Sequence, residues 1–435
     1  SLNNVKVVKK DGTKEEFNVQ KVVVAVNKSA YRALIKFSQK DIDFICHFVE
    51  EKVEELGVHE IQIPEMHNIV EGALEKVNPI VAKSYRDYRN YKQDFVQMLD
   101  EVYKKSQSIM YIGDKENSNT DSALVSTKRS LIFNELNKEL YKKFFLTVEE
   151  LQAIREGYIY IHDMSARRDT MNCCLFDVKS VLTGGFEMGN LWYNEPKTLD
   201  TAFDVIGDIV LSAASQQYGG FTVPSVDEIL EPYAKRSHEN HLNKYRSLGL
   251  SEEVAQEIAW KDLEKEMEQG FQGWEYKFNS VSSSRGDYPF ITMTAGTGTG
   301  RFAKMATISM LDVRRRGQGK EGHKKPVLFP KLVFLYDKNL HGPGCELEDV
   351  FEAGIRCSRQ TMYPDWLSLT GEGYIASMYK KYGKIISPMG CRAFLSPWYK
   401  EGGMKPADEK DEPIFVGRFN IGAVSLHSVS YTHLT

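Results

Sequence analysis

The sequence has few cysteines, no long apolar run and no excess of charge of either sign. Six cysteines in 435 residues are too few for a disulfide scaffold, and no two of them have Cys-x-x-Cys spacing, which argues against a zinc ribbon in this stretch. No run approaches about 18 apolar residues, the length of a membrane span, and no signal peptide opens the sequence. We therefore expect a soluble cytoplasmic protein with no membrane partner.

The charges are nearly balanced. With 56 Lys and Arg against 60 Asp and Glu, the formal net charge is −4. This balance argues against a polybasic nucleic-acid coat, so we expect no direct nucleic-acid binding, although local basic clusters can still bind phosphates. A hydrophobic content of 42% is ordinary for a globular protein, and the length predicts two or three domains.

The first hundred residues predict a small module of a hairpin followed by helices. The run Lys6–Thr13, followed by Glu16–Asn18, predicts a short hairpin with Asp11-Gly12 as its turn. Apolar residues then recur at helical spacing as far as Tyr91. Residues 112–125 are polar and poor in aliphatic side chains, which indicates a linker or surface loop. We assign 1–95 to the module and 96–145 to a helical linker region.

From about residue 145 the sequence alternates strand-like apolar runs with helix-length segments, which predicts α/β architecture. We assign 146–427 to this α/β region and treat 428–435 as a non-native tail. The expected strands are Tyr158–Ile161, Phe290–Met293, Lys331–Leu335 and Ile414–Val416, and the clearest helical segments are Thr198–Tyr218 and Glu252–Gln269.

A candidate phosphate site lies in the N-terminal hairpin. Lys9 and Lys10 stand beside a tight turn at Gly12, and Lys21 begins the following helix. Turn amides, a helix N-terminus and lysines together can bind a polyphosphate. On spacing alone, a solvated basic hairpin is the better interpretation.

A family resemblance reverses that preference. The stretch from Val5 to Tyr91, including the closing Tyr85-Arg86-Asp87-Tyr88-Arg89, resembles the ATP-cone, a regulatory nucleotide-binding domain at the N-terminus of many ribonucleotide reductases. The resemblance implies that ATP or dATP binds as an allosteric effector, and we carry it over to Lys9, Lys10, Gly12 and Lys21.

Three short segments later in the sequence are candidates for chemistry. They are Asn172-Cys173-Cys174, Met389-Gly390-Cys391-Arg392 and Arg418-Phe419-Asn420. A cysteine pair in an apolar run usually packs as a small hydrophobic group, whereas a cysteine between Gly and Arg is in a loop-like setting. Each segment alone is a weak signal.

The order of these segments, together with the ATP-cone, resembles the anaerobic (class III) ribonucleoside-triphosphate reductases, which are glycyl-radical enzymes. The resemblance covers nearly the whole chain. It implies a ten-stranded α/β barrel, incomplete here, with a finger loop near 387–393 whose Cys391 becomes a thiyl radical. It also implies that Cys173 is the second catalytic cysteine, that Cys174 is its apolar neighbour, and that Asn420 is the active-site asparagine.

The implied reaction removes the 2′-hydroxyl of a ribonucleoside triphosphate. Abstraction of the 3′ hydrogen by a Cys391 sulfur radical activates the neighbouring carbon–oxygen bond, and Cys173 on the other face protonates the leaving hydroxyl. Aerobic reductases have a glutamate where this sequence has Ala393, which is consistent with formate as the external reductant. Asn420 then orients the substrate or formate by hydrogen bonds.

Three other features have both a functional and a structural interpretation. His162, shortly before Cys173, is an active-site contact or a satisfied structural histidine. The Gly-rich run Thr294–Arg301 fails the G-x-G-x-x-G dinucleotide fingerprint at Arg301, which favours a loop of close backbone approach. The basic run Arg314–Lys320 predicts a mobile surface loop, with effector sensing as the alternative.

The resemblance also predicts what the sequence does not contain. A four-cysteine zinc site and a radical-bearing glycine belong to the later part of the family's sequences, so we expect a truncated chain that is inactive as a fragment. A homodimer and a separate radical S-adenosylmethionine activating enzyme are the implied partners. The alternatives are another glycyl-radical enzyme of the pyruvate formate-lyase kind, and a non-catalytic nucleotide sensor with a decayed barrel.

Overall fold

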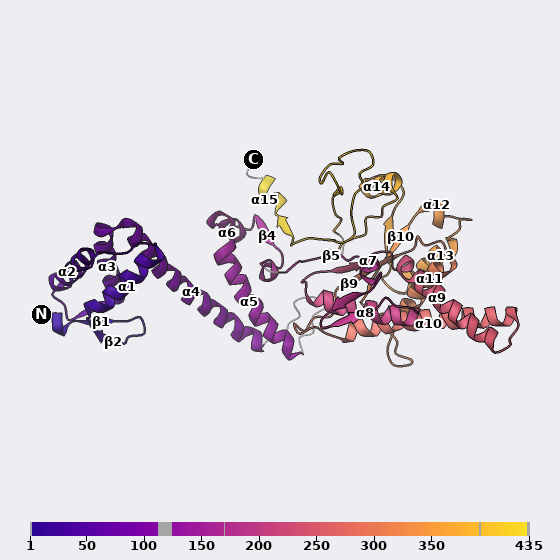
Figure 1. Ribbon diagram of the computed structural model, residues 1–435, viewed down its shortest axis with the longest axis horizontal. Coiled ribbons are helices and arrows are strands. Elements are labelled where there is room, and N and C mark those ends of the chain that lie inside the picture. The colour runs from indigo at the N-terminus through magenta and orange to yellow at the C-terminus, as the bar shows by residue number, and fades with distance from the viewer. Residues whose placement is uncertain (1, 112–123, 169, 391–392, 433–435) are drawn as a thin grey trace. The chain divides into compact units, whose positions relative to one another are not determined.

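The computed structural model describes residues 2–111, 124–168, 170–390 and 393–432 (Figure 1). The chain divides into two compact units, residues 1–104 and residues 105–435, and each is described by itself. Within the described ranges, no helix is long and apolar enough to cross a membrane.

The first unit is a three-stranded sheet packed against helices. Strand β1 (Lys6–Val8) pairs antiparallel with β2 (Lys14–Glu16) and parallel with β3 (Glu60–Gln62), which confirms the predicted hairpin. Gly12 in the turn has φ +82°, a conformation that favours glycine. The unit also contains η1 (Leu2–Asn4), α1 (Val19–Arg32), α2 (Gln39–Leu56), α3 (Ile63–Val77) and the start of α4 (Pro79–Tyr111).

The helices of this unit follow from caps and apolar periodicity. Asn18 accepts a hydrogen bond from the Gln20 amide at the start of α1, and Ser38 forms a capping box with Asp41 at the start of α2. The apolar faces meet in one core, which contains Val26, Ile45, Val49, Ile61, Val70 and Leu74.

The second unit is built on a six-stranded sheet in the order β11-β10-β9-β8-β5-β12. All neighbouring strands are parallel except β12, which runs antiparallel to β5. The central strands are buried along their whole length, as expected where elements cover both faces of a parallel sheet. The strands are β5 (Cys174–Leu175), β8 (Phe221–Val223), β9 (Ile291–Ala295), β10 (Lys331–Tyr336), β11 (Asp365–Ser368) and β12 (Arg418–Phe419).

Helices and two small ribbons surround this sheet. Helix α10 packs against α8, α9 and α11, with Trp274 and Phe271 buried against Phe203. The ribbons pair β4 (Ile159–Ile161) with β13 (Val424–Leu426), and β6 (Phe186–Met188) with β7 (Leu191–Tyr193). The helices are α5 (Val125–Phe145), α6 (Val148–Arg155), η2 (Met164–Ala166), α7 (Val178–Leu182), α8 (Leu199–Ser215), α9 (Val226–Ser247), α10 (Glu252–Ser280), α11 (Arg301–Arg316), α12 (Lys338–His341), α13 (Glu348–Gln360), α14 (Tyr374–Tyr382) and α15 (Ser428–Thr432).

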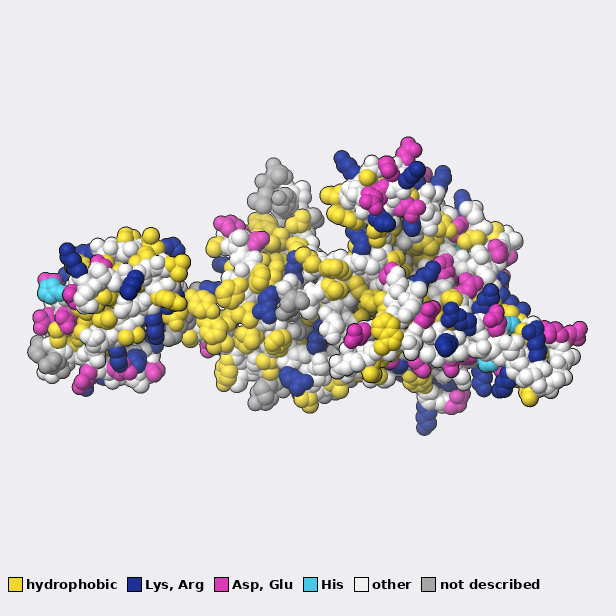
Figure 2. All heavy atoms as spheres, in the orientation of Figure 1, with side chains coloured by type: hydrophobic (Ala, Val, Ile, Leu, Met, Phe, Trp, Pro, Cys, Tyr) yellow, Lys and Arg dark blue, Asp and Glu magenta, His cyan; other side chains and the backbone are white. Residues whose placement is uncertain are grey.

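One face of the second unit exposes apolar side chains. Figure 2 shows hydrophobic side chains gathered over the region of α5, α6 and β4. The exposed ones there include Phe133, Phe144, Phe145, Val148 and Tyr160.

The mixed α/β class and most predicted strands are confirmed. The segments predicted around 158–161, 290–293 and 331–335 are strands β4, β9 and β10. The strand predicted at Ile414–Val416 is wrong, because Phe415 is buried in a small cluster with Ile386 and Met389 rather than in the sheet. The described part of the chain forms an open sheet of six strands, so the ten-stranded barrel stays a prediction.

The start of the basic run Arg314–Lys320 also has a different structure from the predicted surface loop. Arg314 lies in the last turn of α11, not in a mobile surface loop, and its side chain is fully buried. Its Nε lies 2.8 Å from Glu275 Oε1, and Gln318 Nε2 donates to the other oxygen of Glu275 at 2.8 Å. The buried carboxylate of α10 therefore holds the end of α11 in the core.

We expect Arg314→Ala to lower the unfolding free energy of the second unit by about 3–5 kcal/mol, because Glu275 would stay buried without its counter-ion. The control is Arg316→Ala in the same turn, which removes a largely exposed ion pair with Glu268 and should cost about 0–1 kcal/mol. All 5 tryptophans lie in the second unit, so urea unfolding followed by tryptophan fluorescence reports on that unit alone. Equal losses in the two variants would contradict the role of the buried pair.

Candidate functional site

The structure brings Cys173 and Asn420 together at the join of β5 and β12. The Asn420 side-chain Oδ1 accepts a hydrogen bond from the Cys173 amide at 3.0 Å. The Asn420 amide donates to the Cys173 carbonyl at 3.0 Å, and the Asn172 amide donates to the Asn420 carbonyl at 3.0 Å. The asparagine thus fixes the backbone on both sides of the cysteine.

A buried segment, Ser387–Gly390, lies against the same cysteine. An ideal Cβ built on Gly390 would lie 2.9 Å from Cys173 Sγ, and one built on Gly220 would lie 2.2 Å from the Gly390 Cα. Only glycine allows the two backbones to approach this closely. Cys391 and Arg392, the predicted radical cysteine and its neighbour, lie outside the described residues, but the chain that leads into them contacts Cys173.

Three threonines hold this segment in place. Thr222 Oγ1 on β8 donates to the Pro388 carbonyl at 3.0 Å and accepts from the Gly390 amide at 3.1 Å. Thr292 Oγ1 on β9 donates to the Gly390 carbonyl at 2.6 Å. Thr294 Oγ1 lies 3.3 Å from Ser387 Oγ. The segment is therefore hydrogen-bonded to the two central strands of the sheet.

Sequence reasoning missed these threonines. Their signal was present, because Phe-Thr-Val and Ile-Thr-Met-Thr-Ala place hydroxyls inside otherwise apolar, fully buried strands. A buried hydroxyl needs a hydrogen-bond partner, so such a pattern predicts a polar segment packed against the sheet.

Cys174 has a different hydrogen-bond partner from that of Cys173. It is buried, and its Sγ donates to Gln217 Oε1 at 2.9 Å. Burial raises the pKa of the Cys174 thiol to about 12, so the group stays protonated near neutral pH and acts as a hydrogen-bond donor. The predicted apolar neighbour of Cys173 therefore has a polar partner of its own.

His162 lies in the β4–β13 ribbon. Its Nε2 is 2.7 Å from Ser425 Oγ, and its backbone amide donates to the Ala423 carbonyl. Among the described residues, the side-chain hydrogen-bond partner of His162 is thus Ser425. This placement favours the structural interpretation of the histidine.

The Gly-rich run after β9 wraps around a buried carboxylate. The amides of Gly296 and Gly298 donate to Asp227 Oδ2 at 3.1 and 3.0 Å. A Cβ on Gly298 would lie 2.5 Å from the Ala303 Cβ. The predicted loop of close approach is confirmed. Burial raises the pKa of Asp227 above its ordinary value, against the hydrogen bonds that favour its charged form.

The lysines of the first unit converge on one carboxylate. Lys21 Nζ lies 2.6 Å from Glu15 Oε2, and Lys9 Nζ pairs with the other oxygen of Glu15. These hydrogen bonds, that of Lys21 first, lower the pKa of Glu15. Lys10 and Gly12 are exposed beside them in the turn. The two ammonium groups are therefore close enough to bind one anion.

Within the described ranges, no group of three or more His, Cys, Asp or Glu side chains is arranged to hold a metal ion.

Comparison with known proteins covers nearly the whole chain. A family model described as "Anaerobic ribonucleoside-triphosphate reductase" matches residues 116–429, and one described as "ATP cone domain" matches residues 5–94. The chain is 32% identical over 438 residues to the anaerobic ribonucleoside-triphosphate reductase of Haemophilus influenzae, covering 98% of this chain and 59% of the relative. Against the protein of that name in Escherichia coli it is 29% identical over 434 residues, covering 97% and 57%.

Among solved structures, the chain is similar to the anaerobic ribonucleotide reductase from Thermotoga maritima with MES in the active site. That alignment has 14% identity and a TM-score of 0.45, and it covers 67% of this chain and 51% of the solved chain. The chain thus spans 59% and 57% of the length of the two curated relatives named above.

We expect Thr222→Val to loosen the segment Ser387–Gly390, since the variant keeps the shape of the side chain but removes both hydrogen bonds. A loss of about 1–3 kcal/mol in local stability should speed exchange of the Gly390 amide roughly ten- to a hundredfold. Hydrogen exchange read by mass spectrometry on peptides ending at Gly390 measures this change. Thr307→Val, at an equally buried hydroxyl on α11, should leave those peptides unchanged.

Proposed function

Since this chain belongs to the anaerobic ribonucleoside-triphosphate reductase family, we propose that it carries the thiyl-radical site for reducing ribonucleoside triphosphates to 2′-deoxyribonucleoside triphosphates. The observation that supports this most directly is the contact between Cys173 and the buried segment that leads into Cys391. Two thiols on opposite faces of a ribose need such an approach of two separate parts of the chain.

The proposed reaction divides between the two cysteines. A sulfur radical at Cys391 takes the 3′ hydrogen atom and leaves a carbon radical on the ribose. Cys173 then gives a proton to the 2′-hydroxyl, which leaves as water. Formate is oxidised to carbon dioxide: its hydrogen goes to C2′ and its two electrons reduce the sugar. A proton from solution restores the Cys173 thiol, and Cys391 returns the 3′ hydrogen and recovers its radical. Asn420 orients the groups near Cys173 through its side-chain amide.

Formate as the reductant rests on Ala393. This position has no carboxylate where aerobic reductases have a glutamate, which is consistent with an external carboxylate as the reductant, as the family resemblance implies. We propose, as the family resemblance implies, that a separate radical S-adenosylmethionine enzyme generates the radical and that the protein acts as a homodimer.

Regulation belongs to the first unit. We propose that ATP or dATP binds at Lys9, Lys10, Gly12 and Lys21, with the triphosphate taking the place that Glu15 occupies between two of the lysines. Lyases of the pyruvate formate-lyase kind lack a nucleotide-binding regulatory cone. The ATP-cone therefore favours the reductase over this alternative.

The two adjacent cysteines should behave differently in a completed, activated enzyme. Cys391→Ser should abolish turnover and leave the glycyl radical detectable, because the radical forms upstream of that thiol. Cys173→Ser should stop product formation but still permit loss of the 3′ hydrogen, because abstraction precedes proton donation. Cys174→Ser should keep much of the activity, since serine also donates to Gln217.

The assay is deoxyribonucleotide formation with formate under strict anaerobiosis. A dead Cys174→Ser beside a working Cys173→Ser would reverse the assignment of the two thiols. Activity without formate or any thiol reductant would overturn the argument from Ala393. An inactive completed enzyme that still binds ATP or dATP would favour the nucleotide sensor.

Replacing Lys9 and Lys21 together by Ala should weaken binding of ATP or dATP at least tenfold, because both ammonium groups face the same anion position. Glu15→Gln is the matched control, since it keeps both lysines and removes only the competing carboxylate, and it should bind at least as tightly as the parent chain. Titration calorimetry on the 435-residue chain measures both. An unchanged affinity in the double variant would refute the site.

A further inference from the structure

Gln217, two residues after the end of α8, is buried and hydrogen-bonded to the residues around Cys173. Its side chain is only 2% exposed, and its Nε2 donates to the Gly219 carbonyl at 3.1 Å and to the Gly220 carbonyl at 2.8 Å. Its Oε1 accepts from Cys174 Sγ at 2.9 Å. All of its side-chain hydrogen-bonding groups are thus used on the two glycines and the cysteine next to Cys173.

The two glycines in turn contact the Cys173 sulfur. The Gly220 amide donates to Cys173 Sγ at 3.2 Å. A Cβ on Gly219 would lie 2.6 Å from the same sulfur and 2.4 Å from Asn172 Oδ1. Only glycine fits at position 219. The direction in which the Gly220 N–H points depends on the groups that hold the Gly219 and Gly220 carbonyls.

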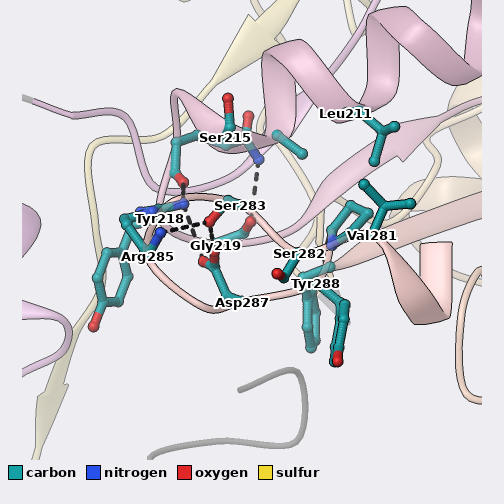
Figure 3. Close-up of a pocket in the computed structure, with 14 residues that line it drawn as sticks. Leu211, Ser215, Tyr218, Gly219, Val281, Ser282, Ser283, Arg285, Asp287 and Tyr288 are labelled. Atoms are coloured by element: carbon teal, nitrogen blue, oxygen red, sulfur yellow. Dashed lines mark hydrogen bonds and ion pairs between the residues drawn. The ribbon is translucent and has the colours of Figure 1, made fainter. Parts of the chain in front are cut away.

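The backbone of Gln217 is held as well. Arg285 donates to the Gln217 carbonyl at 2.7 Å and pairs with Asp287 at 3.0 Å. Figure 3 shows Arg285 and Asp287 pointing toward each other beside Tyr218 and Gly219. Gln217 is therefore held by two parts of the chain: Arg285, in the loop before β9, binds its backbone, and Cys174, on β5, binds its side chain.

We propose that Gln217 is a positioning residue for Cys173: through the Gly219–Gly220 pair it aims an amide hydrogen at the Cys173 sulfur. This inference rests on the proposed function, in which Cys173 donates a proton to the substrate. An amide that occupies one lone pair of the sulfur stabilises the thiolate and directs the thiol hydrogen away from Gly220.

Cys174 takes part in this arrangement as a donor. Its thiol supplies the hydrogen bond that fixes which end of the Gln217 amide faces the glycine carbonyls. Serine keeps that hydrogen bond and valine does not. The pair Cys174→Ser and Cys174→Val therefore tests the same arrangement without changing Gln217.

The experiment measures alkylation of Cys173 by iodoacetamide against pH in the 435-residue chain, with each cysteine resolved by peptide mass spectrometry. The midpoint of the profile reports stabilisation of the thiolate, whereas the plateau at high pH reports access. Gln217→Met keeps the length of the side chain and removes its three hydrogen bonds. It should move the midpoint to higher pH by roughly one unit, about tenfold in rate at a fixed lower pH.

The other variants make the test specific. Cys174→Val should move the midpoint in the same direction, and Cys174→Ser should leave it in place. Thr307→Val, which changes a buried residue of α11, should also leave the midpoint unchanged. Arg285 and Asp287, and also Asp163 and Arg167 in the pocket lined by Asn172 and Tyr218, are the same in every variant.

A change of the plateau alone would mean that Gln217 only packs, and it would overturn the proposal. Equal midpoints for Cys174→Ser and Cys174→Val would do the same, even if Gln217→Met fails to fold. A completed enzyme that makes no deoxyribonucleotide would refute the proposed function and not this inference, because thiol reactivity is measured without turnover.

Discussion

The approach of Gly390 to Gly220 is the constraint on which the rest of the site depends. Two backbones that touch at glycine leave no room for a side chain, and they place one buried segment directly against the Cys173 sulfur. The close approach of two glycine backbones does not itself stabilise the structure, so other contacts must hold the two segments together. The threonines of β8 and β9 supply those contacts from the rigid centre of the sheet.

The same principle recurs throughout the second unit, where buried polar groups join elements that are distant in sequence. Asp227 accepts hydrogen bonds from the amides of the loop after β9, Gln217 accepts one from Cys174 on β5, and Glu275 holds the end of α11. A buried polar group without a partner destabilises a fold, so each of these groups restricts the geometry to one arrangement. Rigidity of this kind suits a site in which two thiols must face one ribose.

The sequence predicted the elements better than their contacts. Apolar periodicity predicted the helices of the first unit, because burial of one face repeats along a helix, and the helix-length segments between strands predicted α8 and most of α10. It failed at Ile414–Val416, where an apolar run packs in a local cluster instead of a sheet.

The hydrogen-bond partners of Thr222, Gln217 and Arg314 were not visible in the sequence. The partner of Thr222 at Pro388 is 166 positions away, and that of Arg314 at Glu275 is 39 positions away. Spacing along a chain carries no information about such pairs. Motif resemblance did bring Cys173 and Asn420 into one hypothesis, and these residues lie in contact.

The apolar side chains exposed over α5, α6 and β4 have a consequence for how the chain behaves in solution. Exposed apolar side chains lose contact with water when two molecules associate through them, so association should increase with concentration. Because hydrophobic attraction weakens on cooling, dilute and cold solutions favour dispersed chains. The surface therefore sets the colloidal stability of the chain independently of the stability of its fold.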